Sequence, residues 1–407
     1  MNSAKSKPVG MPQRRHVLLL AAFAAMAPLS IDLFLPGVPI MRAELQASPR
    51  LTAATLSVFF IGLAFGQLVS GPLSDRVGRR APIIGGLLTY TAASAMASFA
   101  PSIGVLLFAR ALQAVGASAV TVTGRAVVRD LFDHRGTARM LSTLALISSM
   151  APVLAPLLGS ALLHVAGWRA SFEFMTAFGL LIFTAAFVLQ GESRSKKTER
   201  RARSAHPLRT YGRLITHRRL LGYLGAAAFN GSCLFTYLAI APLVLMPIYG
   251  LTPTAFALVF GVNAIGLVAA NQINRLLLAR ISPDAVLQVT STGALILAAG
   301  FAFFALTLLG GLPFLMALIF LMVASSSLVQ SNAMAGALSV DPHRAGSIAA
   351  LFGATAFGAG TVTSFIAGLL FDGTPRAMMG VIATALLGMA ATLKYLALRD
   401  PRPPSVP

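Results

Sequence analysis

The stretch GPLSDRVGRR, residues 71–80, lies between two long apolar segments that contain no charged residue near it. Gly71 and Gly78 permit a tight turn at this point. Asp75 can accept hydrogen bonds or lie at the N-terminus of a helix. The three arginines would hold the turn at one face of a membrane. The stretch therefore predicts a turn that joins two membrane-spanning helices.

The composition indicates that lipid is the solvent for most of this chain. Of the 407 residues, 56% are hydrophobic and 11% are charged, against about 25% charged in ordinary soluble domains. So few charges cannot cover the surface of a soluble protein of this size. A spanning helix needs about 20 apolar residues, and twelve such segments account for most of the length. The single cysteine, Cys233, excludes an internal disulfide framework.

The apolar segments on either side of residues 71–80 belong to a series that continues along the chain. Each is long enough to cross a bilayer, and most connections between them are very short. The predicted spans are 17–40, 51–73, 81–100, 104–129, 137–163, 170–190, 220–247, 254–274, 285–309, 313–338, 346–370 and 376–397. The expected fold class is an all-α membrane protein with twelve transmembrane helices.

The longest polar interval between the predicted spans is 191–219, and it separates two sets of six. We therefore expect an N-terminal six-helix half over 1–190, a basic cytoplasmic linker over 191–219 and a C-terminal six-helix half over 220–407. This layout is typical of transporters built from two pseudo-symmetric halves, with the substrate site between the halves near the middle of the membrane.

The 32 Lys and Arg residues are distributed unevenly between the two faces of the predicted bundle. With the N-terminus inside, 27 of them fall on the cytoplasmic side, four on the opposite side, and Arg110 inside a span. This bias follows the positive-inside rule and places both termini in the cytoplasm. It also accounts for the net charge of +20 without a nucleic-acid partner. The basic stretch 194–203 is then a topology signal in a solvated linker, or a site for anionic lipid.

The turn at 71–80 resembles a motif of the major facilitator superfamily, whose loop between the second and third helices reads G-x-L-a-D-r-x-G-r-k. The resemblance implies a latch that holds the cytoplasmic side closed in the outward-facing state. The second half lacks a good copy, because residues 271–282 have basic side chains without the acid or the glycines. The expected latch residues, two of them from the sequence VRDLF, are Gly71, Asp75, Arg76, Gly78, Arg79, Arg80, Arg129 and Asp130.

Asp32, in the sequence APLSIDLFLP (27–36), lies within the first apolar segment. A carboxylate in this position costs roughly 2.5–3.5 kcal/mol on insertion scales. Of the twelve acids in the chain, Asp32 alone lies well inside a predicted span. An intramembrane acid is a functional-site candidate by default. We expect Pro28 and Pro36 to bend the helix and turn the carboxylate toward a central cavity.

Arg110 lies in the fourth predicted span, in the sequence RALQAVGASA (110–119). At 1.5 Å per residue, Arg110 and Asp32 both lie roughly 9–12 Å from the outer ends of their helices, so the two can interact. The stretch resembles the superfamily's fourth-helix pattern R-x-x-q-G-x-g-a-a, with Ala114 in place of the first glycine. We predict that Asp32 and Arg110 couple proton movement to transport. The alternative for Arg110 is an arginine that snorkels to the outer interface.

Two prolines one helical turn apart occur in the fifth predicted span, in the sequence APVLAPLLGS (151–160). Each proline removes a backbone hydrogen bond, so the helix should bend there. The stretch resembles the antiporter motif G-P-x-x-G-G of drug exporters. The residues expected in this motif are Pro152, Pro156 and Gly159, and an ordinary packing kink is the alternative.

Landmarks from the first to the eleventh predicted helix, among them PLSIDLFLPGVP (28–39) and SNAMAGALSVDPHRAGSIAALFG (331–353), resemble the bicyclomycin/chloramphenicol resistance (Bcr/CflA) subfamily. The resemblance implies a monomeric exporter of drugs, or in some members of small metabolites, in exchange for protons across the bacterial inner membrane. The sequence has no H-E-x-x-H motif, no nucleotide-binding P-loop and no convincing nucleophile–base pair, so it predicts neither an enzyme nor an ATP-driven pump. All six histidines fall near span ends or in loops, so we expect no metal site and no cofactor, with a proton gradient as the driving force.

Polar and aromatic residues of the later spans are candidates for contact with a small-molecule substrate, because amides and aromatic rings suit partly apolar ligands. Helix packing explains each of them equally well. The candidates are Asn230, Phe235, Tyr237, Asn263, Gln330, Asn332, Phe352 and Phe357. A second hypothesis keeps the fold and changes the cargo to a sugar or an amino-acid-derived metabolite. A third is a non-transporting membrane receptor or scaffold.

Overall fold

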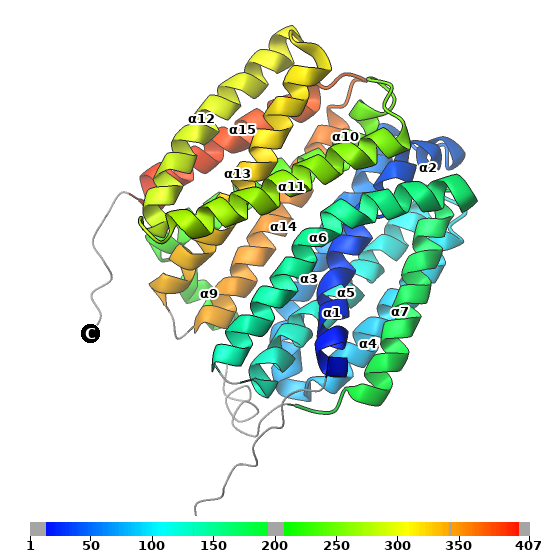
Figure 1. The fold of residues 1–407 in the computed structure, drawn as a ribbon, viewed down its shortest axis with the longest axis vertical. Helices are drawn as coiled ribbons and strands as arrows, with labels where there is room; N and C mark the ends of the chain where they lie inside the picture. Colours follow the sequence, from blue (N-terminus) through cyan, green and yellow to red (C-terminus); the bar gives the residue numbers. More distant parts are fainter. Residues whose placement is uncertain (1–13, 133, 194–206, 342–343, 399–407) are drawn as a thin grey trace, which may run out of the picture.

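The computed structural model describes residues 14–132, 134–193, 207–341 and 344–398, and every regular element in these ranges is a helix. Each of the twelve predicted spans is helical, ten of them within a single long helix and the first and last in more than one helical segment, and the predicted fold class is confirmed (Figure 1). The elements are α1 (Arg14–Asp32), the 3₁₀ helix η1 (Leu35–Gly37), α2 (Val38–Glu44), α3 (Pro49–Val77), α4 (Arg80–Ser98), α5 (Ile103–Leu131), α6 (His134–Ala166), α7 (Arg169–Leu189), α9 (Pro207–Leu214), α10 (Arg218–Leu245), α11 (Pro253–Leu277), α12 (Pro283–Thr307), α13 (Gly311–Val340), α14 (Ala345–Leu369), α15 (Arg376–Thr392) and η3 (Leu393–Ala397).

Local sequence explains where several of these helices begin. Ser48, Ser102, Thr252 and Ser282 immediately precede α3, α5, α11 and α12, and each side chain accepts a hydrogen bond from a backbone N–H of the first turn. Three of these four helices also have proline in the first turn, where its missing N–H is not needed. The caps make the short connections possible.

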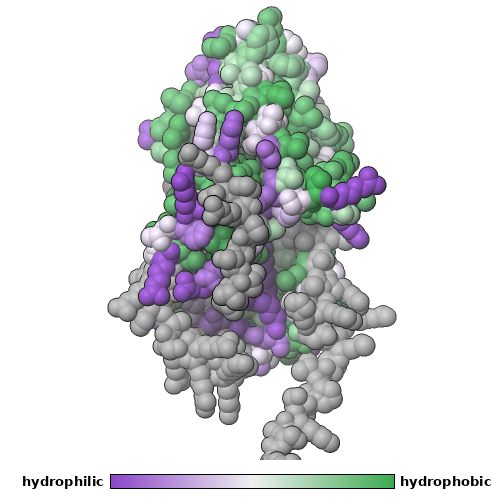
Figure 2. All heavy atoms as spheres, turned by 90° about the vertical axis from the view of Figure 1, so that its left-hand side faces the viewer, coloured by the Kyte–Doolittle hydropathy of each residue, from purple (hydrophilic) through white to green (hydrophobic). Residues whose placement is uncertain are grey.

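The outer surface of the bundle is apolar. Ten helices of the described chain are long and apolar enough to cross a membrane, and a shorter apolar helix covers Met150–Ala166 within α6. Every long helix exposes large apolar side chains, such as Phe65, Phe187 and Val289. Figure 2 shows one face on which hydrophobic residues dominate the upper part and hydrophilic residues gather in the lower part. Apolar exposure on this scale is what a protein surrounded by lipid requires.

The long helices form two groups, α1–α7 and α10–α15 (Figure 1). In the first group, α3 and α4 pack on α5, α7 packs on α4, and α6 packs on α1. In the second, α14 and α15 pack on α10, while α11 and α12 pack on α13. The main contacts between the groups are α3 with α14 and α6 with α11. This agrees with two six-helix halves, whereas the boundaries at 190 and 220 stay a prediction.

The first span differs from the continuous helix expected over 17–40. Its α-helix ends at Asp32, and the chain continues through a turn and η1 into α2. Pro36 has no N–H to donate to the Asp32 carbonyl, which removes one helical hydrogen bond at the residue where α1 ends. Pro28 stays within α1 and leaves the Ala24 carbonyl without a helical donor. The Ser148 hydroxyl of α6 donates to that carbonyl at 3.2 Å, as a freed polar group in lipid requires.

Small and hydroxyl-bearing residues join α3 to α14, and thus the two groups to each other. The hydroxyls of Ser57 and Ser364 are 2.8 Å apart and hydrogen-bonded. The Thr361 hydroxyl also donates to the Ser57 carbonyl at 3.3 Å. Nearby, Gly368 lies close against Ala53. Small residues at such positions allow two helix backbones to approach closely.

This contact can be tested by a cross-link. In a Cys233→Ser background with a protease site inserted between residues 193 and 207, we expect Ser57→Cys and Ser364→Cys to form a disulfide, because the two side chains already touch. After cleavage, the two fragments should migrate together on a non-reducing gel and separate on reduction. A Ser57→Cys/Ser291→Cys pair, whose second site lies in α12, should not cross-link. Separation of the oxidised Ser57/Ser364 pair would contradict the α3–α14 contact.

Candidate functional site

Asp32 lies at the junction of the two helix groups. It is the one buried carboxylate in the described parts of the chain, with 3% of its surface exposed. It makes no hydrogen bond or ion pair with any described residue. Its charge acts on the hydroxyl of Tyr237, which belongs to α10 in the other group. The end of α1 therefore carries a buried acid without a partner among the described residues, where ionisation is costly.

Arg110 is fully buried in α5, but it does not pair with Asp32 as expected. Its Nη1 donates to Gln113 Oε1 at 2.6 Å, while Nε and Nη2 have no hydrogen-bond partner in the part of the chain that the structure describes. Three aromatic rings lie with their centroids 4.1–5.8 Å from its guanidinium carbon, those of Phe34, Phe59 and Phe172. Both groups are buried, but the depth argument did not give the direction of their side chains. Snorkelling to an interface is also excluded by full burial.

The predicted antiporter motif lies beside the break in the first span. Pro152 and Pro156 are both inside α6. A methyl group at Gly159 would collide with the backbone of Leu33, the residue after Asp32. The carbonyl of Leu33 also accepts a hydrogen bond from the Ser171 hydroxyl at 3.4 Å. Glycine at 159 thus allows α6 to support the chain directly where α1 ends.

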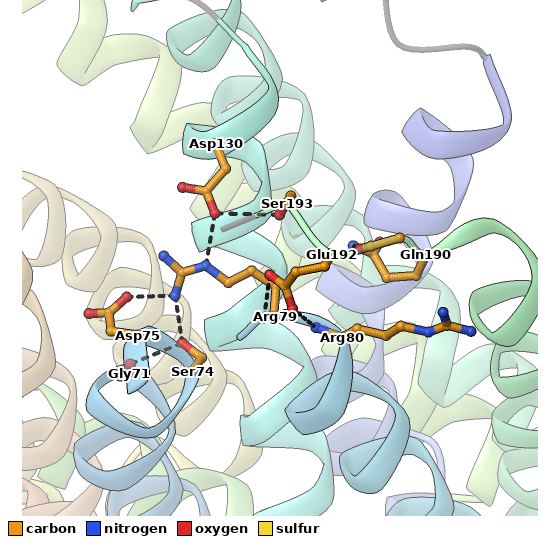
Figure 3. A network of polar contacts seen from close by, with 10 residues as sticks. Gly71, Ser74, Asp75, Arg79, Arg80, Asp130, Gln190, Glu192 and Ser193 are labelled. Atoms are coloured by element: carbon orange, nitrogen blue, oxygen red, sulfur yellow. Dashed lines mark hydrogen bonds and ion pairs between the residues drawn. The ribbon is translucent and has the colours of Figure 1, made fainter. Parts of the chain in front are cut away.

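Arg79 is the centre of the predicted latch (Figure 3). Its Nη1 donates to Asp75 at 2.5 Å and to Ser74 at 2.9 Å, and its Nε donates to Asp130 at 2.8 Å. The Ser74 hydroxyl in turn donates to the Gly71 carbonyl at 2.9 Å. Burial acts to lower the pKa of the Arg79 guanidinium, but its hydrogen bonds to Asp130 and Asp75 raise that pKa above its ordinary value. Arg79 therefore stays charged and links α3 to the end of α5.

The other predicted latch residues surround this centre in different ways. Gly78 has φ +102°, a left-handed conformation that favours glycine. The Arg80 guanidinium turns toward α7 and donates to the Phe187 carbonyl at 3.1 Å. Arg76 and Arg129 are exposed, and Arg129 makes no hydrogen bond or ion pair within the described ranges. The structure brings together the residues around Arg79 and leaves Arg129 outside the network.

Two residues of the network were missed in the sequence, Glu192 and Ser193. The Glu192 carboxylate accepts hydrogen bonds from the backbone N–H groups of Arg79, at 2.9 and 3.0 Å, and Arg80, at 3.4 Å. The Ser193 hydroxyl donates to Asp130 at 3.4 Å. Both follow the sixth span directly, within the predicted linker. The only sequence feature that could have indicated Glu192 is its position just after an apolar segment. An acid in that position is usually exposed to solvent, so it did not stand out.

Two of the aromatic substrate candidates, Phe235 and Phe357, meet at the junction between the groups. The rings of Phe235 and Phe357 stack with centroids 5.1 Å apart, and Phe60 of α3 packs on both, at 4.1 and 6.1 Å. Tyr237 accepts a hydrogen bond from Asn263 Nδ2 at 2.9 Å. The structure thus joins α3, α10 and α14 through one aromatic cluster.

The remaining candidates contact residues of the second group. Asn230 Nδ2 donates to the Ser326 carbonyl at 3.3 Å and to Gln330 Oε1 at 3.5 Å. Asn332 Nδ2 donates to Asn274 Oδ1 at 2.8 Å, and Phe352 is fully buried. These contacts are those of helix packing, the alternative that the sequence left open. Within the ranges that the structure describes, no three His, Cys, Asp or Glu side chains gather as a metal site would need.

A family model of the major facilitator superfamily matches residues 18–365. The chain belongs to the major facilitator superfamily. It is a multi-pass membrane transporter, not an enzyme. The chain is 32% identical over 394 residues to an uncharacterised MFS-type transporter, YdgK, of Bacillus subtilis (strain 168), and the match covers 94% of this chain and 96% of that protein.

Other relatives have names that refer to drug resistance. A bicyclomycin resistance protein homolog of Haemophilus influenzae is 28% identical, over 88% of this chain and 89% of that protein. A chloramphenicol resistance protein of Pseudomonas aeruginosa is 34% identical over 62% of this chain and 59% of that protein. Among solved structures, a D-xylose–proton symporter matches with a TM-score of 0.73 and 12% identity, covering 94% of this chain and 97% of that one. The structural match shows the fold alone. The relatives confirm the resemblance found in the motifs.

The contact at Gly159 leads to a matched pair of substitutions. We expect Gly159→Ala to destabilise the protein by about 1–3 kcal/mol, the usual cost of overpacking, because the new methyl group meets backbone that cannot rotate away. Gly85→Ala, which also adds a methyl group within a helix but meets no atom within 4 Å, should leave stability unchanged or raise it. Thermal unfolding in detergent compares the two. Equal melting temperatures would contradict the close contact of α6 with Leu33.

Proposed function

We propose that this protein is a proton-coupled antiporter that exports drugs or similar small amphipathic compounds across the bacterial inner membrane by alternating access. Both termini then lie in the cytoplasm, and one chain is sufficient because both halves belong to it. The observation that carries the proposal is Asp32, a buried acid without a hydrogen-bonding partner among the described residues, at the junction of the two helix groups.

Asp32 suits the role of a proton carrier because its protonated and ionised forms are stabilised by different surroundings. The neutral acid is tolerated in an apolar site, whereas the carboxylate needs a cation or hydrogen-bond donors. A substrate that supplies such groups competes with the proton for the same acid. Binding of one then favours release of the other, which is exchange. The driving force is a proton gradient, and no cofactor is required.

Arg110 contributes to the same site through its fixed position rather than through a direct ion pair. Its guanidinium is held by Gln113 and the aromatic rings, with two nitrogens unsatisfied. The ring of Phe34, two positions after Asp32, lies on this guanidinium, so the broken segment connects the two groups. Movement of the broken segment that follows Asp32 changes the distance between the two groups and with it the affinity for a proton.

The nature of the cargo rests on the relatives and on the aromatic cluster. The printed names of the relatives refer to bicyclomycin, chloramphenicol and multidrug resistance. The rings of Phe60, Phe235 and Phe357 at the junction suit partly apolar compounds once the halves separate. The alternative cargo is a sugar or an amino-acid-derived metabolite carried by the same fold. A non-transporting receptor is the least favoured function, since the acid has no role in it.

Replacement of Asp32 tests the proposal directly. In proteoliposomes with a pH gradient and chloramphenicol or ethidium as probe, Asp32→Asn should reduce uphill transport and probe-driven proton movement to the level of empty liposomes. The amide cannot release a proton. Its melting temperature should equal or exceed that of the wild type, because an unpaired buried acid is removed. The matched control is Glu173→Gln on the exposed face of α7, which should transport normally. Uphill transport by Asp32→Asn would contradict the assignment.

The cargo is tested by comparing compound classes in one strain. Overexpression should raise resistance to chloramphenicol or cationic dyes, and the Asp32→Asn variant should abolish the increase. Measurement of exported sugars and amino-acid derivatives in the same cultures addresses the alternative. Metabolite export without any change in drug susceptibility would show that the substrate is a metabolite and not a drug. The proposed mechanism would be unaffected.

A further inference from the structure

We propose that Glu192 is a positioning residue of the latch, so that the first residues of the linker between the two halves are a working part of it. The proposal rests on alternating access between the halves, but not on the nature of the cargo or on proton coupling. It is carried by the contacts of Glu192 and Ser193 with the residues around Arg79 (Figure 3).

Glu192 takes the place of a missing helix cap. The N-cap position of α4 is occupied by Arg79, whose guanidinium has only donors and cannot accept a hydrogen bond from the first turn. The first N–H groups of α4 would therefore lack an acceptor. Glu192, 113 positions further along the chain, supplies one with both carboxylate oxygens. A negative group at a helix N-terminus is favourable by charge as well as by hydrogen bonding.

The turn before α4 is built around this carboxylate. A Cβ atom at Gly78 would collide with the carboxylate of Glu192. Gly78 is thus needed for two reasons: its left-handed φ of +102°, and the space that Glu192 occupies. Because Glu192 fixes the backbone of Arg79, it also fixes the direction from which the guanidinium reaches its two acids.

Ser193 extends the same contact to the other side of the ion pair. Its hydroxyl donates to the Oδ2 atom of Asp130 that also accepts from Arg79 Nε. The Arg79 side chain is 3% exposed and that of Asp130 13%, so these bonds are shielded from water. The linker therefore contacts both partners of the central ion pair, one through the backbone and one through the side chain.

The far part of the linker contacts the second half. Helix α9 lies next to α14, the helix that packs on α3. The connection between the halves is thus attached to the latch at one end and to α14 at the other. When the halves separate, the contacts of Glu192 with Arg79 and those of α9 with α14 are both affected. Loss of Glu192 should therefore weaken the latch.

The test measures the separation of the halves without any substrate or pH gradient. Spin labels at Leu18→Cys in α1 and Leu276→Cys in α11, both exposed, report that separation in a Cys233→Ser background. We expect Glu192→Ala to raise the ratio of long to short interspin distances roughly tenfold, the effect of losing one charge-assisted hydrogen bond. Glu192→Gln, which keeps the shape and loses the charge, and Ser193→Ala should each produce a smaller shift in the same direction. Glu173→Ala on α7 is the matched control and should produce none.

A double-variant cycle separates positioning from simple stability. If Glu192 acts through Arg79, the shift caused by Glu192→Ala should be much smaller in an Asp130→Asn background, because the ion pair is already broken. A merely structural role would lower the melting temperature while leaving the distance ratio unchanged, and that result would overturn the proposal. Full additivity of the two substitutions would overturn it as well. Either outcome leaves the Asp32→Asn transport test untouched, so the two proposals fail separately.

Discussion

Lipid offers no hydrogen bonds, so every polar group within the spans has to be satisfied by the protein itself. This constraint determines the structure around the first helix. Pro28 frees the carbonyl of Ala24, and Ser148 from α6 bonds to it. Pro36 ends the helix at Asp32, and the carbonyl of the next residue, Leu33, accepts from Ser171 of α7. The two breaks are therefore held by neighbouring helices, and the fold of the first half depends on those contacts.

The buried charges follow the same constraint with two different results. Arg79 is surrounded by acceptors, so its network is a stable connection between elements. Asp32 has none among the described residues. A buried ion pair is costly to break once formed, whereas an unpaired acid changes its protonation state with its surroundings. The first arrangement suits a latch, and the second suits a site that must exchange its partner in every cycle.

Hydropathy and motif spacing predicted the twelve helices and the turn at 71–80, because both signals are local. A bend at Pro28 and Pro36 was expected, but the end of the α-helix at Asp32 was not, since average hydropathy is insensitive to a missing N–H. The pairing of Asp32 with Arg110 was inferred from helix rise. The helical rise per residue gives the depth of a residue in the membrane but not the direction of its side chain. The Arg110 guanidinium lies among the rings of Phe34, Phe59 and Phe172 instead. Glu192 could not be found from sequence, because its partners are more than a hundred positions away.

Helix α3 connects the two places where the halves are controlled. Near one end it carries Ser57 and Phe60, which contact α14 and α10, and at the other it carries Asp75 of the latch. Ser57 and Asp75 are about 27 Å apart along the helix axis. Pro72 lies between them, and a proline within a helix provides a point of bending. Helix α3 can therefore bend between these two regions, so the position of one does not by itself fix the position of the other. The contacts of Ser57 and Phe60 with the second half and the Arg79 network of the first half are thus carried by the same helix, on opposite sides of Pro72.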